Sequence, residues 1–177
     1  RFVLSKGHGI TTLYAVLAER GFFSPKLFEN YAQAGSPLPE HPSPLCVSGI
    51  EAATGSLGHG LSISVGIALA SKMNSIPYNV VTLLSDGECN EGSTWEAALL
   101  APVHNLDNLI AIVDLNKWQA TGRSAEITAL EPLDKKFEAF GWNAIRIDGH
   151  DFNQMKSALT TAKQSEKPFA IIADTVK

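Results

Sequence analysis

The sequence predicts an α/β protein with an open parallel sheet and helices on both faces. Two observations support this prediction. Short apolar runs of strand length alternate along the chain with segments of helical periodicity, which is the pattern of consecutive strand–helix–strand units. The apolar runs are nearly continuous rather than alternating with polar residues, as expected for parallel strands that are buried on both faces.

Length and composition limit the classes of protein to which the chain can belong. The 177 residues suffice for one domain, and 45% hydrophobic against 18% charged residues support a buried core and exclude a disordered chain. A net charge of −4 without any basic run argues against nucleic-acid binding, and no apolar run is long enough to cross a membrane. The two cysteines, Cys46 and Cys89, are too few for a disulfide framework and favour a reducing, cytoplasmic location.

The first part of the chain predicts two helices followed by a long loop. Residues 8–20 carry apolar side chains at helical spacing, and Gly21 follows as a natural residue to end the helix. Ser24-Pro25 predicts the start of a short helix that extends to about residue 34. Four prolines within residues 35–48 exclude regular helix or a central strand there.

The rest of the chain predicts the body of the sheet. Residues 61–73 are almost entirely small and apolar, which predicts a helix buried on most sides. The predicted strands are residues 80–84, 109–113, 143–147 and 169–173, and the helices between them are residues 91–104, 133–140 and 153–163.

Polar residues follow two of the predicted strands directly. Asp86-Gly87-Glu88 ends one strand and Asn116 ends the next, so we expect them to lie on neighbouring loops at one edge of the sheet. Carboxylate and amide oxygens suit Mg²⁺ or Ca²⁺, Gly87 allows close approach of the backbone, and the following helix offers free N–H groups to a phosphate. These residues predict a metal-bridged diphosphate site, although an Asp-Gly turn with a distant Asn also occurs for purely structural reasons.

Four stretches, taken in order, resemble the transketolase family of thiamine diphosphate enzymes. Ser85-Asp86-Gly87-Glu88 with Asn116 resembles the family's cofactor motif, with Ser85 where the family has a glycine. The other three stretches are RFVLSKGHG at residues 1–9, GIEAATGSLGHG at residues 49–60 and EGSTWEA at residues 91–97. The resemblance implies the thiamine diphosphate-binding fold of the diphosphate-binding type, with thiamine diphosphate and Mg²⁺ (or Ca²⁺) as cofactors.

The resemblance also implies roles for single positions. Asp86 and Asn116 would be side-chain ligands of the metal, and the backbone carbonyl of Trp118 would complete the protein ligands. His41 would take part in proton transfer near the reacting carbon of the substrate, and His8 would share that work while contacting the diphosphate. The implied cofactor-binding set is His8, Gly55, Ser56, Leu57, Asp86, Gly87, Glu88, Asn116 and Trp118.

The family resemblance implies that this chain needs a partner. We expect residues 1–177 to form a single diphosphate-binding domain, incomplete at both ends, without the pyrimidine-binding domain whose glutamate activates the cofactor. That half would come from a separate subunit or from more of the same polypeptide, in a homodimer or heterotetramer. Glu91 and Glu96 match carboxylates near this interface. The expected reaction is transfer of a two-carbon ketol unit from a ketose phosphate to an aldose phosphate, as in the pentose phosphate pathway.

Two alternatives remain open from the sequence. Another thiamine diphosphate enzyme, a 1-deoxyxylulose-5-phosphate synthase or the E1 component of a 2-oxo acid dehydrogenase, shares the Asp-Gly and Asn pattern. A non-catalytic module that retains the fold would share it too, and the departure at Ser85 is compatible with such a module. A nucleotide-binding Rossmann domain is disfavoured because no G-x-G-x-x-G opens a strand-to-helix turn.

Overall fold

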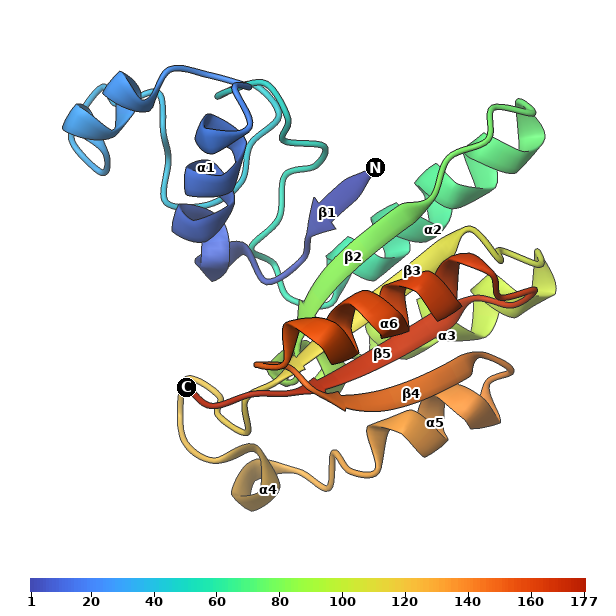
Figure 1. Cartoon of the computed structure of the whole chain (residues 1–177). Helices are drawn as coiled ribbons and strands as arrows, with labels where there is room; N and C mark the ends of the chain where they lie inside the picture. The colour runs from blue at the N-terminus through green and yellow to red at the C-terminus, as the bar shows by residue number, and fades with distance from the viewer.

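The computed structural model describes residues 1–177 and confirms the predicted class. Five strands form one sheet in the order β1-β2-β3-β5-β4, and every neighbouring pair is parallel (Figure 1). The strands are β1 (Phe2–Leu4), β2 (Val80–Ser85), β3 (Leu109–Leu115), β4 (Asn143–Asp148) and β5 (Phe169–Asp174).

Six α-helices and three short 3₁₀ segments connect the strands. None of the helices combines the length and the apolar composition that a membrane span requires. The α-helices are α1 (Ile10–Glu19), α2 (His59–Met73), α3 (Gly92–Val103), α4 (Ser124–Ile127), α5 (Leu133–Ala139) and α6 (Phe152–Lys163). The 3₁₀ segments are η1 (Gly7–Gly9), η2 (Pro25–Asn30) and η3 (Gly87–Asn90).

The sheet is covered on both faces, as predicted. The central strand β3 shows this best: Leu109, Ala111 and Val113 belong to a core shared with α2, α3 and α5. Ile110 faces the opposite way, into a smaller core with α6. A third apolar cluster joins α1 and residues 38–50 to β1. Because successive side chains of a strand point to opposite faces, near-continuous apolar strands are what a sheet covered on both sides requires.

The prediction that residues 61–73 are buried on most sides is wrong. Helix α2 buries a single side, formed by Leu61, Ser64, Val65, Ala68 and Ser71. The opposite side is partly or fully exposed, and Met73 at the end of the helix is 76% exposed. Composition cannot distinguish the two cases, because a helix built from small apolar residues has no polar stripe to mark its outer face.

Three local features differ from the sequence predictions. Strand β1 was not predicted, because three residues are too few to show a strand pattern, and the same applies to the four-residue helix α4. The short helix after Ser24 ends at Asn30 rather than near residue 34, because Tyr31 turns extended and Ala32 takes a positive φ of 57°. The end of α1 agrees with prediction, since Gly21 has a φ of 80°.

Candidate functional site

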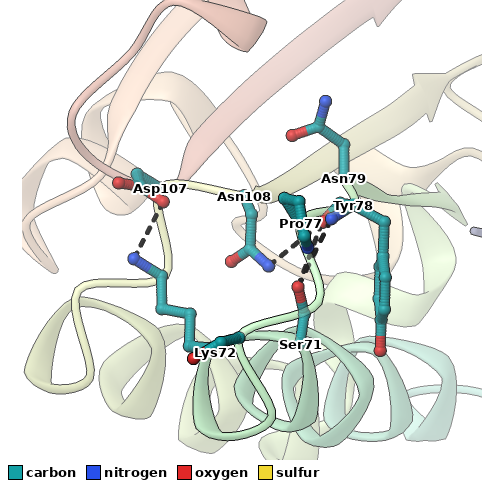
Figure 2. Close-up of a pocket in the computed structure, with 8 residues that line it drawn as sticks. Ser71, Lys72, Pro77, Tyr78, Asn79, Asp107 and Asn108 are labelled. Carbon is teal, nitrogen blue, oxygen red and sulfur yellow. Dashed lines mark hydrogen bonds and ion pairs between the residues drawn. The ribbon is translucent and has the colours of Figure 1, made fainter.

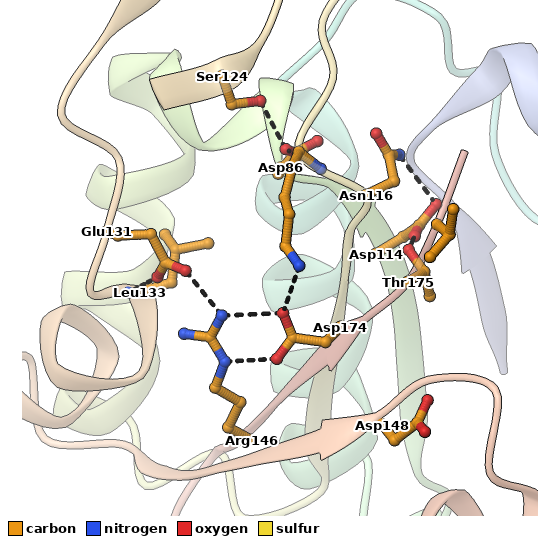
Figure 3. Close-up of polar contacts among 12 residues, drawn as sticks. Asp86, Asp114, Asn116, Ser124, Glu131, Leu133, Arg146, Asp148, Asp174 and Thr175 are labelled. Atoms are coloured by element: carbon orange, nitrogen blue, oxygen red, sulfur yellow. Dashed lines mark hydrogen bonds and ion pairs between the residues drawn. The ribbon is translucent and has the colours of Figure 1, made fainter. Parts of the chain in front are cut away.

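Asp86 is a fully buried carboxylate at the carboxyl end of β2. Its Oδ1 accepts a hydrogen bond from the Gly87 backbone N–H at 3.0 Å. Its Oδ2 accepts from the Lys117 backbone N–H at 3.1 Å and from the Ser124 hydroxyl at 2.6 Å (Figure 3). None of these three donors is cationic, so a buried negative charge lies here without a positive side chain to compensate it. Burying an uncompensated charge is costly, and this favours a cation at the site.

Asn116 follows β3 on the neighbouring loop, as predicted from strand topology. Its Oδ1 accepts from the Trp118 backbone N–H at 3.0 Å, and its Nδ2 donates to Asp114 Oδ2 at 3.3 Å. Asp114 is in turn paired with the Lys6 ammonium and accepts from the Thr175 hydroxyl (Figure 3). Burial alone would raise the pKa of Asp114, but these donors outweigh it and hold the pKa below its usual value. Asp114 thereby fixes which way the Asn116 amide faces.

A cavity of about 420 Å³ opens at the carboxyl ends of these strands. It brings together five of the predicted residues: His8, Leu57, Gly87, Asn116 and Trp118. Asp86 lies buried next to Gly87, below the cavity wall. The complete lining is His8, Leu57, Ser85, Gly87, Asn116, Trp118, Gln119, Ala120, Thr121 and Lys177.

His8 and Lys177 place basic groups on the cavity wall. His8 sits in the 3₁₀ turn after β1, and Lys177 follows β5, so strands at two positions in the sheet contribute them. Burial, together with the positive charge of Lys6, lowers the pKa of His8 below its usual value. This favours the neutral form of the His8 imidazole, which can accept or donate one proton, while the Lys177 side chain suits an anionic ligand.

His41 lies outside the cavity lining but packs tightly on two glycines that carry the site. A Cβ built on Gly55 would lie 2.6 Å from His41 Cδ2, and one on Gly7 would lie 3.0 Å from the same atom. Gly55 also has a φ of 135°, which side-chain-bearing residues rarely adopt. The Pro-rich loop thus lies against the turn that carries His8, and the His41 side chain remains exposed.

The remaining two residues of the predicted cofactor set do not face the cavity. Ser56 lines a separate cavity of about 410 Å³ with Ala53, Thr54, His59 and Ile63. Glu88 is fully buried, and both of its carboxylate oxygens are taken by hydrogen bonds within the protein. The side chain of Glu88 is therefore unavailable to a ligand. It can affect the site only through the residues that donate hydrogen bonds to it, Ser5, Gly58 and Ser85.

Sequence reasoning missed Gln119. This residue lines the cavity, its side chain lies beside Gly87, and its Nε2 is buried without a hydrogen-bond partner. Buried amide groups are normally paired, so an unpaired donor at the cavity wall suits an oxygen-rich ligand. The only signal in the sequence is its position three residues after Asn116, which does not distinguish Gln119 from its neighbours on the loop.

The loop that carries Asn116 and Trp118 is tied to β5 and β4 by ion pairs. Arg146 on β4 makes two hydrogen bonds to Asp174 at the end of β5, at 2.5 and 2.9 Å, and pairs with Glu131 at 2.9 Å (Figure 3). Lys117 Nζ lies 3.4 Å from Asp174 Oδ1. Hydrogen bonding from Arg146 lowers the pKa of Asp174, against the opposing effect of burial. One end of the loop thus pairs with the Asp174 carboxylate and the other with the Arg146 guanidinium, and these two groups pair with each other.

A cavity of about 470 Å³ lies at the opposite, amino ends of β2 and β3. Its polar groups bond largely to each other: Lys72 pairs with Asp107 at 2.9 Å, and Ser71 donates to the Tyr78 carbonyl at 3.4 Å (Figure 2). Ser71 also donates to the Ile76 carbonyl at 2.6 Å. Asn108 donates to the carbonyls of Ala68 and Tyr78. These contacts close the turn between α2 and β2, and no predicted site residue lies here.

The donor set at the carboxyl ends fits a hard metal ion and a diphosphate. A carboxylate, a carboxamide oxygen and backbone carbonyls are oxygen ligands of the kind that Mg²⁺ and Ca²⁺ prefer. No group of three or more His, Cys, Asp or Glu side chains is arranged around a common point. Lys177, the unpaired Gln119 amide and Gly87 line the space where phosphate oxygens would lie.

Comparison with known proteins identifies the family. Residues 1–177 match the family model described as "Transketolase, thiamine diphosphate binding domain". The chain belongs to the transketolase family. This confirms the resemblance seen in the four sequence stretches, and with it the thiamine diphosphate-binding fold.

Some of the similar proteins are named as transketolase subunits, and others are named as transketolases. The chain is 46% identical to the 6-deoxy-6-sulfo-D-fructose transketolase subunit SqwG of a Clostridium species and 42% identical to an apulose-4-phosphate transketolase subunit of Actinobacillus succinogenes. All or nearly all of this chain is matched, but it spans only 65% and 64% of those subunits. Human transketolase is 43% identical over the whole chain, which spans 28% of that protein.

Solved transketolase structures share the fold closely. The transketolase of Campylobacter jejuni superposes with a TM-score of 0.95 at 37% identity, over 99% of this chain and 29% of that one. The transketolase of Leishmania mexicana gives a TM-score of 0.92 at 31% identity, with 99% of this chain covered. The arrangement of sheet and helices described above is therefore that of the thiamine diphosphate-binding domain of transketolases.

Proposed function

We propose that this domain binds thiamine diphosphate through Mg²⁺ and acts in ketol transfer as part of a transketolase. The observation that carries the proposal is the buried Asp86 carboxylate, uncompensated by any cationic side chain, beside Asn116 at the wall of a cavity. A divalent cation there would supply the missing positive charge and bridge to the diphosphate.

The metal ligands from this chain would be few. Asp86 Oδ1 and Asn116 Oδ1 each accept one hydrogen bond and retain a further lone pair, and the Trp118 carbonyl lies on the same loop as Asn116. Mg²⁺ usually takes only a few protein ligands and completes its octahedron with phosphate oxygens and water. The Gly87 backbone and the Gln119 amide then face the phosphate oxygens, with Lys177 as a counter-charge.

The carbon chemistry would be supplied by the bound thiazolium ring, which serves as the electron sink in ketol transfer. This chain would bind and orient that group and move protons around it. Imidazole is the usual side chain for proton transfer near neutral pH, and we assign His41 and His8 to the donor and acceptor oxygens. Burial lowers the pKa of His8, and this favours the neutral imidazole, the form that can accept a proton.

The substrates and the partner are inferred from the named relatives. The relatives include subunits named for apulose 4-phosphate and for 6-deoxy-6-sulfo-D-fructose, both of them sugars with an anionic group. We infer a ketose and an aldose with an anionic terminus as substrates. A pyrimidine-binding half, as a second subunit or as another part of a longer chain, would complete the site and supply the group that activates the cofactor.

The test is native purification of this protein from its source cells, followed by mass spectrometry of the intact assembly. Thiamine diphosphate with a co-purifying pyrimidine-binding half supports the proposal, and ketol transfer between sugar phosphates then establishes the reaction. Decarboxylation of a 2-oxo acid in place of ketol transfer would reassign the reaction to an E1-type enzyme. Absence of both cofactor and partner would identify a non-catalytic module and contradict the roles given to His8 and His41.

A further inference from the structure

We propose that Glu88 is a positioning residue whose buried carboxylate joins three of the chain segments that line the candidate cofactor cavity. The sequence places it in the cofactor motif, but the structure turns it away from the cavity, with no exposed surface. Its function lies in what it holds together. The inference rests on the proposed function in one respect only, the identity of the ligand that those segments bind.

Four donors from three separate segments meet this one carboxylate. Oε1 accepts from the Ser5 hydroxyl, at the end of β1, and from the Gly58 backbone N–H at 3.1 Å, at the start of α2. Oε2 accepts from the Ser85 backbone N–H at 2.9 Å and from the Ser85 hydroxyl at 3.5 Å, at the end of β2. Glu88 is the one side chain that hydrogen-bonds to all three segments.

Each segment carries candidate site residues within a few positions of its contact with Glu88. Ser5 precedes His8, Gly58 follows the run Gly55-Ser56-Leu57, and Ser85 directly precedes Asp86 and Gly87. The three segments lie up to 80 residues apart in the chain, from Ser5 to Ser85. Pairing of β1 with β2 aligns two of these segments, and the shared acceptor at their junction ties the start of α2 to both.

The packing around the junction leaves the carboxylate little freedom. A Cβ built on Gly60 would lie 2.1 Å from Ser5 Oγ, so the Ser5 hydroxyl is confined against the start of α2. Gly58 has a φ of 83°, and a Cβ there would lie 2.5 Å from Glu91 Cβ. Thr54 also links two of the segments by donating to the Leu4 carbonyl at 2.5 Å, but it does not reach the end of β2.

The chemistry of the junction requires an acceptor-only side chain. A carboxylate offers about four lone-pair sites and no donor, which matches the four donors present. In Glu88→Gln the amide has nearly the same shape but one end becomes an NH₂ group. Whichever way that amide faces, its NH₂ meets a backbone N–H, of Gly58 or of Ser85, which cannot accept. One buried backbone donor is then left unpaired.

The experiment compares hydrogen exchange in the full-length protein, wild type against Glu88→Gln, without cofactor. We expect amide exchange on the order of tenfold faster in residues 5–9, 54–60 and 85–87 together, as one lost buried hydrogen bond implies. Helices α5 and α6 should keep wild-type protection. Wild-type exchange in residues 54–60 and 85–87, or an equal increase over the whole chain, would overturn the proposal.

Ser71→Ala is the matched control, because Ser71 is also a buried serine and its hydroxyl makes its hydrogen bonds at the amino end of β2, away from the site. It should speed exchange only near residues 71–80. Ser5→Ala covers the case in which Glu88→Gln does not fold. It removes one of the four donors, so residues 5–9 should exchange faster while residues 85–87 do not; unchanged residues 5–9 would contradict the proposal.

Cofactor binding separates this inference from the proposed function. With the pyrimidine-binding half present, Glu88→Gln should bind thiamine diphosphate about tenfold more weakly than wild type, and Ser71→Ala should bind it normally. Normal affinity in Glu88→Gln would overturn the positioning role. A wild-type protein that binds no thiamine diphosphate would instead contradict the proposed function, and the exchange result would stand by itself.

Discussion

Residues at the carboxyl ends of β2 and β3 act through their neighbours as much as through their own chemistry. Asp86 accepts from the backbone of the loop that carries Asn116, and Asn116 is oriented by Asp114, which is itself paired with Lys6. A substitution at any of these positions therefore changes the geometry of the others. This coupling calls for control substitutions of the same residue type outside the network.

Asp86→Ala should abolish Mg²⁺-dependent binding of thiamine diphosphate in the assembled protein, because it removes the buried carboxylate beside Asn116. Isothermal titration with and without Mg²⁺ measures this. Asp148 offers a matched control, since it is also an aspartate at the carboxyl end of a strand but lies apart from the site (Figure 3). Asp148→Ala should bind normally. Retained affinity in Asp86→Ala would remove the metal assignment.

His41→Ala should slow ketol transfer by a factor on the order of 10² to 10⁴, the usual contribution of a positioned acid or base, with cofactor affinity close to normal. Gly55→Ala should reproduce the loss, because the new methyl group would occupy the place of the His41 ring. Gly21→Ala is the control: it also has a positive φ, but a Cβ there meets nothing within 4 Å. Steady-state kinetics with a separate cofactor titration checks all three variants. Loss of cofactor binding in His41→Ala would show that His41 contacts the cofactor rather than the substrate.

Among the elements, the loop from residue 116 to residue 131 depends most on distant contacts. It contains only the short helix α4, and its two ends are tied to β5 and β4 through Lys117–Asp174 and Glu131–Arg146. Trp118 is covered by the Arg123 guanidinium, 4.9 Å from the ring centre. A wall of the cavity is therefore held by these ion pairs and by the hydrogen bonds from Lys117 and Ser124 to Asp86, with little secondary structure of its own.

Arg146→Met should loosen this loop while leaving the sheet intact. The lost pairs are partly exposed, so the expected decrease in the free energy of unfolding is small, about 1 kcal/mol. Trypsin should cut faster after Lys117 and Arg123, which lie on the loop. Lys135→Met is the control, because it removes an exposed pair with Glu138 on α5, away from the loop. Equal cleavage rates in the two variants would contradict the anchoring role of Arg146.

Helix α6 has a pH-dependent amino-terminal cap. The Asp151 carboxylate accepts from the backbone N–H groups of Gln154 and Asn153, and these bonds lower its pKa below the usual value. A lowered folded-state pKa means stabilisation that is present at neutral pH and is lost as the pH falls through that value. Asp151→Ala should therefore lower the melting temperature at pH 7, and the difference from wild type should shrink toward pH 3. A difference that does not change with pH would argue against the ionised cap.

At the scale of the whole molecule, the outer sides of α2 and α3 leave apolar side chains exposed. On α3, Leu99, Leu100 and Val103 are 52%, 45% and 73% exposed, and they lie on adjacent turns. Several large apolar side chains on neighbouring turns are typical of a surface that contacts a partner. This agrees with the proposal that another half or subunit completes the protein.

Leu100→Asp should weaken that association at least about tenfold, since burial of a leucine is worth roughly 1.5–3 kcal/mol and a buried unpaired charge costs more. Mass photometry of the purified assembly against concentration measures the shift to smaller species. Thr160→Asp places the same charge on exposed α6, at the opposite face of the sheet, and should leave assembly unchanged. An unchanged size distribution for Leu100→Asp would show that this side of α3 is free of partners.

The class of fold, and the edge of the sheet at which the candidate site lies, follow from the sequence. Strands that are apolar throughout are recognisable locally, and polar residues that follow parallel strands must gather at one edge of the sheet. Asp86, Gly87 and Asn116 could be found for this reason. Only the tertiary structure decided that Glu88 turns inward, that Gln119 lines the cavity and that α2 is covered on one side. Each of these three features depends on contacts between segments that are distant in the chain. Such contacts cannot be inferred from the residues next to a position in the sequence.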